Sequence, residues 1–326
     1  MSTAATSRAP AASATRPGSP RVGSLLRAWQ RAYRSTPNFR GKGRVLFDWP
    51  GRLIHSWPSD VEITSGAGCV FRHCDLSEYL YRSLFFFGCF EPDVDWACRR
   101  VLRPGDTFVD KGACFGYHTL TASLRVGPGG RIYAIEPQPD MFAALEENAL
   151  CNKATNIVMD NLALSDRAES LQLHRFAGLG VGHTSIATMG QAVFQVHSCP
   201  AITLDEFIGR RSVGPVALVK LDVEGAEMKI LRGAQALLQR PDPPMWVLEV
   251  NVETAQACGY QPSDLLAFLS GFGYQAYRPV WGELLREIRR FELCPPGDIQ
   301  HGQNLLCAIP AVHAEALARA GAAPRG

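Results

Sequence analysis

The hydrophobic pattern between residues 106 and 310 alternates between short apolar runs and longer amphipathic stretches. The apolar runs predict strands and the amphipathic stretches predict helices. The predicted strands cover 106–110, 131–136, 156–160, 216–222, 245–250, 273–277 and 304–309. The predicted helices cover 115–126, 140–151, 225–239 and 263–270. Val-, Ile- and Leu-rich strands alternating with helices indicate an α/β fold, in which a doubly wound, mostly parallel sheet binds its ligand at the carboxyl ends of the strands.

The two ends of the chain differ from this pattern. Residues 1–44 predict a disordered basic tail with one short helix, because 1–22 are mostly Ala, Ser, Thr, Arg and Pro. An organellar transit peptide is the alternative for this start. Within 23–35, Leu25, Leu26, Trp29 and Tyr33 follow helical spacing, which predicts a helix that docks on the main domain or, alternatively, lies on a membrane surface. Residues 45–310 are predicted to form one domain, and 311–326 a fraying helical tail.

Charge and composition exclude several classes of protein. The chain of 326 residues is 46% hydrophobic and 20% charged, which excludes a wholly disordered chain. No apolar stretch approaches the roughly 18 residues that a membrane-spanning helix needs. Residues 1–44 hold nine basic residues and no acid, so the remainder has 24 basic and 31 acidic residues and a net charge of −7. This charge argues against a duplex nucleic-acid substrate.

The ten cysteines lie singly along the chain, without a CxxC pair. A zinc site would need clustered ligands, and a disulfide framework is typical of small secreted chains. Reduced thiols in a cytoplasmic protein are therefore expected.

A glycine-rich turn after the first predicted strand is the main candidate for a cofactor site. It reads Asp110-Lys-Gly112-Ala-Cys-Phe-Gly116 and leads into a helix. A dinucleotide site would need GxGxxG, whereas an acid two positions before the first glycine suits a cationic ligand such as S-adenosylmethionine. Glu136 ends the next strand, where its carboxylate can accept both hydroxyls of a ribose.

Several further motifs carry a resemblance to the FkbM family of S-adenosylmethionine-dependent methyltransferases, from about residue 79 to residue 251. In chain order they are Phe87-Gly-Cys-Phe-Glu91-Pro92, Arg103-Pro-Gly-Asp106, the cofactor turn, Ala134-Ile-Glu-Pro137, Leu145-Glu-Glu-Asn148, Asn161-Leu-Ala-Leu-Ser-Asp166, Thr203-Leu-Asp-Glu-Phe207, Val219-Lys-Leu-Asp-Val-Glu-Gly-Ala-Glu227 and Leu248-Glu249. The resemblance implies a Rossmann-like class I methyltransferase fold with a seven-stranded sheet.

The resemblance also implies roles for particular residues. Asp110, Gly112, Gly116 and the adjacent Tyr117 would line the methionine end of the cofactor. Glu136 would hold the ribose. Ala163 and Leu164 would contact the adenine, and Asp222 would end a strand beneath the reacting centre.

Two positions depart from the family pattern D-V-G-A-N-x-G. Lys111 replaces an aliphatic residue beside a cationic cofactor, and Cys114 replaces an amide that can donate to the cofactor carboxylate. These departures leave room for a weak or degenerate enzyme.

Acidic residues at neighbouring strand ends supply candidates for catalysis. Asp222 and Glu224 are candidates, and so is His183 in a glycine-rich loop. Asp222, Glu249 and Asn251 could together bind a divalent metal. In the favoured alternative, Glu224 caps the next helix or pairs with Lys220, Glu249 pairs elsewhere, and no metal binds.

The predicted function is methyl transfer to a hydroxyl of a sugar, glycolipid or secondary metabolite, with a small-molecule or glycan acceptor. N-methylation of a protein or RNA, and a catalytically degenerate binding protein with this fold, are the alternatives. His118, on the helix after the cofactor turn, is expected to be structural.

Overall fold

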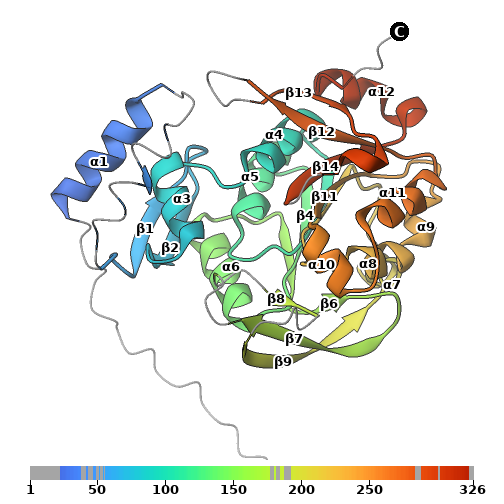
Figure 1. Ribbon diagram of the computed structural model, residues 1–326, viewed down its shortest axis with the longest axis horizontal. Coiled ribbons are helices and arrows are strands. Elements are labelled where there is room, and N and C mark those ends of the chain that lie inside the picture. Colours follow the sequence, from blue (N-terminus) through green and yellow to red (C-terminus); the bar gives the residue numbers. More distant parts are fainter. Residues whose placement is uncertain are drawn as a thin grey trace, which may run out of the picture.

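The structure is a computed structural model that describes residues 23–37, 42, 47–48, 51, 54, 56–176, 180, 184–186, 192–282, 288–299 and 302–322 (Figure 1). The predictions for residues 1–22 and for His183 fall outside the described residues. The predicted division of the chain at residues 44 and 310 stays a prediction.

Eight strands form the central sheet of the described chain, in the order β13-β12-β14-β11-β10-β3-β4-β5. The five strands from β11 to β5 are parallel, and the other three pair antiparallel. Their bounds are β3 (Thr107–Lys111), β4 (Arg131–Ile135), β5 (Ile157–Asp160), β10 (Leu218–Leu221), β11 (Met245–Val250), β12 (Gln275–Trp281), β13 (Ile288–Leu293) and β14 (Gln303–Ala308). The predicted α/β fold with a mostly parallel, doubly wound sheet is confirmed. The predicted seven strands are all present, and β13 adds an eighth at the edge.

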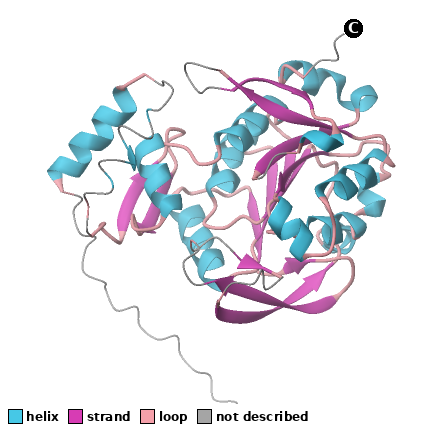
Figure 2. Cartoon of the chain, viewed as in Figure 1, coloured by secondary structure: helices cyan, strands magenta, loops and turns pink. Residues whose placement is uncertain are grey.

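Helices cover both faces of this sheet, as Figure 2 shows. On one face, the apolar side of the sheet around Phe108 packs against α4 (Pro92–Val101), α5 (Tyr117–Val126) and α12 (Pro310–Arg319). On the other face, Trp246 and its neighbours pack against α7 (Leu204–Arg210), α8 (Glu227–Arg232), α9 (Gln235–Leu238) and α11 (Pro262–Ser270). Two further helices are α6 (Pro139–Cys151) and α10 (Val252–Ala257). Burial on both sides explains why the strands read as continuous apolar runs.

The strand order places a switch point between β3 and β10. The chain continues from β3 to β4 on one side, and β10 lies on the other side. At such a point the loops after the two strands diverge and leave a crevice at the carboxyl ends. The cofactor turn follows β3, so the fold puts it at this crevice.

A second sheet in the order β6-β9-β7-β8 packs beside the crevice, and the apolar-run pattern does not predict it. Its strands are β6 (Ala163–Leu164), β7 (Glu169–Phe176), β8 (Thr184–Ser185) and β9 (Val193–Ile202). In β7, Leu171 and Leu173 are buried, whereas Ser170 and Gln172 are exposed. A strand with one wet face has too few apolar residues to form a continuous run.

The N-terminal region forms a small unit of α1 (Ser24–Ser35), β1 (Val61–Thr64), β2 (Val70–Cys74) and α3 (Tyr79–Phe87), drawn in blue to cyan in Figure 1. Helix α1 docks on α3: Gln30 donates a 2.8 Å hydrogen bond to the Phe85 carbonyl, and the ring of Tyr33 lies against that of Phe86. The docking predicted from the spacing is therefore present. Leu25 departs from it, because it is 86% exposed.

Two predicted helical segments differ from the structure. The helix predicted over 225–239 is two short helices, α8 and α9, separated near Gly233, where a Cβ would lie 2.3 Å from the Ser165 carbonyl oxygen. The predicted fraying tail is the packed helix α12, in which Leu317 is fully buried.

All ten cysteines are described and all are free thiols. Burial raises the pKa of each of them. Among the described helices, none combines the length and hydropathy that crossing a bilayer requires.

Candidate functional site

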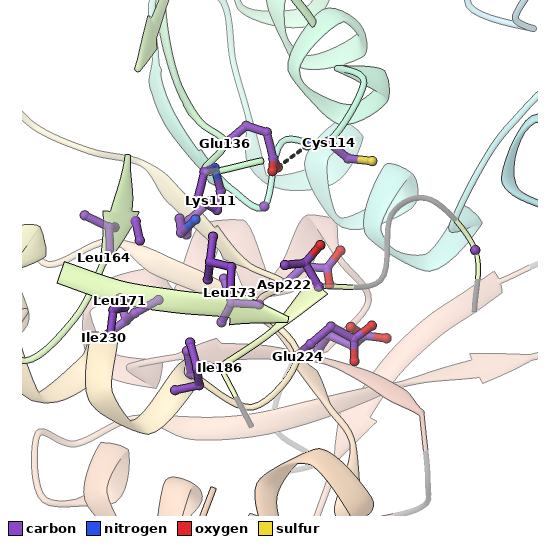
Figure 3. A pocket seen from close by; sticks show the side chains of 18 of the residues that line it. Lys111, Cys114, Glu136, Leu164, Leu171, Leu173, Ile186, Asp222, Glu224 and Ile230 are labelled. Atoms are coloured by element: carbon purple, nitrogen blue, oxygen red, sulfur yellow. Dashed lines mark hydrogen bonds between the residues drawn. The ribbon is translucent and has the colours of Figure 1, made fainter. Parts of the chain in front are cut away.

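A cavity of about 410 Å³ opens at the carboxyl ends of β3, β4, β10 and β11. This volume is in the range of small-molecule sites, which is roughly 300–1,000 Å³. The wall is formed by Tyr79, Leu80, Phe90, Glu91, Lys111, Gly112, Cys114, Glu136, Pro137, Ala163, Leu164, Leu171, Leu173, Gly180, Thr184, Ile186, Asp222, Val223, Glu224, Ala226, Ile230 and Glu249. One end is apolar, with Leu164, Leu171, Leu173, Ile186 and Ile230, whereas Asp222 and Glu224 mark the acidic end (Figure 3).

The glycines of the cofactor turn are required by the packing around them. Gly112 has φ +81°, and a Cβ there would lie 1.9 Å from the backbone oxygen of Asp222. Gly116 has φ +92°, and its Cβ would lie 2.6 Å from Leu145 Cδ1. Only glycine combines this backbone conformation with such a close approach. The turn after β3 is therefore pressed against the loop after β10.

Glu136 lies on the cavity wall directly after β4. The Cys114 and Gln138 backbone N–H groups each donate a 2.8 Å hydrogen bond to its carboxylate, one to each oxygen. Burial raises its pKa, while the Lys111 ammonium and these two backbone N–H groups oppose that shift. A carboxylate has about four lone-pair sites, so both oxygens keep capacity for two hydroxyl donors from a ligand.

Lys111 is a buried amine on the same wall, with 3% of its surface exposed. Burial lowers its pKa, and the neighbouring Glu136 carboxylate partly offsets that effect. The Glu136 carboxylate is thus the negative charge that partly compensates the burial of the Lys111 ammonium.

Asp110 lies behind the cavity. Side chains alternate along a strand, so Lys111 points to one face of the sheet and Asp110 to the other. The Asp110 carboxylate accepts a 2.6 Å hydrogen bond from Thr119 on α5. Lys220, its register partner on β10, brings Nζ to 3.9 Å from the other carboxylate oxygen.

Lys220 also organises the acidic end of the cavity. Its Nζ donates to Asp222 Oδ2 at 2.8 Å and to the Gly112 carbonyl at 3.3 Å. Burial alone would raise the pKa of Asp222, but Lys220 and a hydrogen bond from Glu249 hold that pKa at about 2. The negative charge of Asp222, followed by burial, raises the pKa of Glu249 well above its usual range. The surroundings therefore favour the ionised form of Asp222 and the protonated form of Glu249.

The cavity unites some of the predicted site residues. Gly112, Glu136, Ala163, Leu164, Asp222 and Glu224 lie on its wall. Asp110, Gly116 and Tyr117 are predicted cofactor residues that lie outside that wall. Their roles stay predictions, and Asp110 and Gly116 support the turn from behind.

Of the three residues considered for a metal site, Asp222 and Glu249 lie together on the cavity wall, but Asn251 does not join them. Asn251 uses its side-chain oxygen to accept hydrogen bonds from the Glu253 and Thr254 backbone N–H groups, which caps α10. It is absent from the cavity wall. Within the described ranges, no group of three or more His, Cys, Asp or Glu side chains could hold a metal ion.

Sequence reasoning missed Glu91 and the aromatic residues near it. Tyr79 and Leu80 of α3 line the cavity, as do Phe90 and Glu91 just before α4. The charge of Glu91 interacts with that of Asp222, so Glu91 belongs to the acidic end. The motif around Glu91 carries part of the family resemblance. No periodicity or spacing, however, links Glu91 to Asp222 and Glu224, which lie more than 100 residues further along the chain.

Comparison with known proteins assigns the chain to a family. Residues 110–276 match the methyltransferase FkbM domain. The chain belongs to the FkbM methyltransferase family. The resemblance predicted from the motifs is thereby confirmed.

Two named relatives illustrate this family. The chain is 28% identical over 204 residues to 31-O-demethyl-FK506 methyltransferase FkbM of Streptomyces tacrolimicus, covering 54% of this chain and 75% of that protein. It is 26% identical over 180 residues to the hexuronic acid methyltransferase AglP of Haloferax volcanii, covering 55% and 68% of the two chains. Among solved structures, Aeropyrum pernix fibrillarin in complex with S-adenosyl-L-methionine aligns over 78% of this chain and 96% of its own, with a TM-score of 0.37 and 14% identity.

The cavity of this FkbM-family chain fits the predicted cofactor, S-adenosylmethionine. The Glu136 carboxylate matches a ribose diol, the apolar end around Leu164 matches an adenine ring, and the acidic end matches a sulfonium. Gly112 lets the turn after β3 pack against the loop after β10 at the cavity wall.

Proposed function

We propose that this chain transfers a methyl group from S-adenosylmethionine to a hydroxyl of a sugar, glycolipid or secondary metabolite. The observation that carries the proposal is the position of Glu136. Its carboxylate is fixed by two backbone N–H groups on the wall of a cavity whose opposite end is acidic. The relatives are named for a hydroxyl position of FK506 and for a hexuronic acid, which supports oxygen as the acceptor atom.

In this proposal the protein aligns the reactants, and the bound sulfonium supplies the reactive methyl group. Glu136 orients the nucleoside. Asp222 keeps its negative charge near the reacting centre, because Lys220 stabilises the ionised form. The apolar walls exclude water from the adenine end. A cytoplasmic location is part of the proposal, since ten free thiols suit a reducing compartment.

Calorimetric titration with S-adenosylhomocysteine tests the cofactor site. We expect saturable binding by the unmodified protein and affinity about 10- to 100-fold weaker in Glu136→Gln, because hydrogen bonds to a charged group contribute roughly 1.5–3 kcal/mol. Glu146→Gln, an exposed position on α6, is the matched control and should bind normally. Absence of heat at millimolar ligand would refute the enzyme and leave the degenerate binding protein.

Labelled methyl transfer tests the acceptor class. The panel contains neutral sugars, glycolipids, 31-O-demethyl-FK506, a protein extract and RNA. We expect the label in an oxygen-linked methyl group of a small molecule or glycan. Label found only in protein or RNA would overturn the proposed acceptor class while keeping the methyltransferase.

A further inference from the structure

Glu91 has an unusual backbone position at the acidic end of the cavity. It lies directly before Pro92 and α4 with φ 41°, a left-handed conformation that non-glycine residues rarely adopt. It occupies the N-cap position of α4, yet its side chain makes no capping hydrogen bond. The residue lines the cavity. Strain of this kind persists where the surrounding structure enforces it, which is frequent at functional sites.

His118 holds the Glu91 carboxylate from behind. Its Nε2 lies 2.8 Å from Glu91 Oε2, and its side chain is 6% exposed. The rings of Phe90 and Tyr117 flank the imidazole, with centroids 6.3 and 5.0 Å away. Among the described residues, no partner hydrogen-bonds to its Nδ1. The imidazole is therefore fixed by packing and by one polar contact, the one to Glu91.

Two other acids near this position are unsuited to accept a proton. Asp222 is stabilised in its ionised form by Lys220, which makes it a weak base. The negative charge of Asp222 favours the protonated form of Glu249. Glu91 is tied only at Oε2, by His118, in the contacts of the described chain, and that leaves Oε1 for a ligand.

The charges around Glu91 support a proton-accepting role. Burial, followed by the negative charge of Asp222, raises its pKa to about 8, with Asp110 and Glu224 adding to the rise and Lys220 opposing it. Burial and the Lys220 charge lower the pKa of His118 to about 4, so the imidazole is neutral at pH 7. A general base is most effective when its pKa lies near the working pH.

We propose that Glu91 is the general base of the methyl transfer, that His118 is a residue positioning it, and that the acceptor is a neutral hydroxyl. This inference rests on the proposed function. The acceptor oxygen forms the new bond to the methyl carbon, and the electrons of the broken carbon–sulfur bond go to sulfur, which becomes a neutral thioether. The hydroxyl proton goes to Glu91 Oε1.

The same surroundings select the acceptor. The ionised Asp222 lies at this end of the cavity together with Glu91, Glu224 and Glu249, so a carboxylate or phosphate acceptor would meet repulsion. An anionic oxygen also needs no base. A neutral hydroxyl can approach the acids as a hydrogen-bond donor, and it needs proton removal as the methyl group transfers.

Glu91→Gln tests the base directly. With the hydroxyl acceptor that the panel identifies, we expect kcat to fall about 10²- to 10⁴-fold, the usual contribution of general base catalysis. Binding of S-adenosylhomocysteine should stay within twofold of the unmodified protein, and Glu146→Gln should keep both properties. If Glu91→Gln retains kcat within threefold, Glu91 is not the base.

A paired acceptor tests the predicted specificity. A neutral glycoside and the corresponding uronide, which carries a carboxylate, differ in one group. We expect methylation of the neutral hydroxyl compound and loss of that activity in Glu91→Gln. Methylation of the carboxylate at the same rate by both proteins would overturn the neutral acceptor and the base together.

An acceptor-independent measurement is the titration of the Glu91 side chain. In protein labelled with ¹³C at the glutamate carboxyl carbon and saturated with S-adenosylhomocysteine, the signal missing from Glu91→Gln should titrate with a midpoint near 8. A midpoint below about 6 would contradict the proposal, because the ordinary glutamate pKa is near 4.3 and such a group is a weaker base.

Two His118 variants separate positioning from mere packing. His118→Leu removes the polar contact. The midpoint of the rise of kcat/KM with pH should therefore move to higher pH, since a lost hydrogen bond to the Glu91 carboxylate disfavours its charged form. His118→Gln places an amide donor near the Nε2 position and should return the midpoint towards the unmodified value. A midpoint unchanged in both variants would assign His118 a structural role only.

Failure of this inference and failure of the proposed function give different results. If the unmodified protein does not bind S-adenosylhomocysteine or transfers no methyl group, the proposed function fails. If it does both and Glu91→Gln does so equally well, only the role of Glu91 fails.

Discussion

The two ends of the cavity are built in opposite ways. Around Glu136, at the nucleoside end of the proposed site, backbone groups set the geometry: two glycines allow the turn after β3 to pack closely, and two N–H groups fix the single carboxylate of Glu136. At the acceptor end, four acids line the wall, and the buried ammonium of Lys220 donates to one of them, Asp222. Backbone geometry suits a cofactor that is always the same. Closely coupled side-chain charges suit proton transfer, because small changes in surroundings shift pKa values strongly.

Replacement of Lys220 should cause the largest loss of stability, because its buried ammonium lies between the carboxylates of Asp110 and Asp222. Lys220→Met leaves the buried Asp110 and the half-buried Asp222 without a cation, and loss of one partner of a buried ion pair costs about 3–5 kcal/mol. Denaturant unfolding at pH 7.5 should show this loss, and the loss should be smaller at pH 5, because Asp222 is protonated more readily once Lys220 is gone. Lys229→Met is the control, since that side chain is 37% exposed and 3.8 Å from Glu169. A loss equal to that of the control would contradict the coupling.

Gly112→Ala should break the nucleoside end. The new Cβ would clash with the Asp222 backbone oxygen in a left-handed conformation. We expect a loss of about 2–4 kcal/mol in unfolding free energy and no detectable binding of S-adenosylhomocysteine. Gly129→Ala has no atom within 4 Å of its added Cβ and should be neutral. Normal cofactor binding by Gly112→Ala would show that the turn does not touch the ligand.

Glu91→Gln should change how the unfolding free energy depends on pH. The folded pKa of Glu91, about 8, lies above its value in the unfolded chain. The folded state therefore holds a proton that the unfolded state releases, and this contribution to stability is lost as pH rises from about 5 to 8. Glutamine stays neutral. The unfolding free energy of Glu91→Gln should therefore rise relative to that of the unmodified protein by about 1–3 kcal/mol across that pH range. A gain independent of pH would mean that Glu91 is ionised in the fold at pH 5.

Cys114→Asn should have the smallest effect. Cys114 has φ 50°, a conformation that asparagine tolerates better than most residues. Its backbone N–H still donates to Glu136. We expect less than about 1 kcal/mol of added stability and tighter binding of S-adenosylhomocysteine, measured by calorimetry. Weaker binding would show that the thiol itself contacts the ligand.

The sequence predicts the nucleoside end better than the acceptor end. The turn from Asp110 to Gly116 and the following Glu136 are close in sequence, and each follows a strand with a clear apolar pattern. Their neighbourhood follows from parallel pairing alone. The exception is Asp110, which was expected on the wall but points to the opposite face of the sheet because side chains alternate along β3.

The acceptor end depends on contacts that no local pattern encodes. Glu91 and His118 come from the starts of two helices, and Lys220 lies inside a strand that reads as apolar. Only the three-dimensional register of β10 against β3 shows that Lys220 faces Asp110. The small sheet was not predicted because its strands have one solvent-exposed face. Its strand β7 supplies Leu171 and Leu173 to the cavity without forming a continuous apolar run.

The buried thiols give the folded chain little reactivity towards alkylating reagents. Thiolate is the reactive form, and burial raises the pKa of all ten cysteines, to about 11 for Cys69, Cys89 and Cys258. Unfolding restores ordinary thiol acidity along the whole length of the chain. The labelling rate of each cysteine therefore reports the local unfolding of the residues around it. Maleimide labelling, followed residue by residue with mass spectrometry, would rank the parts of the molecule by how readily they unfold.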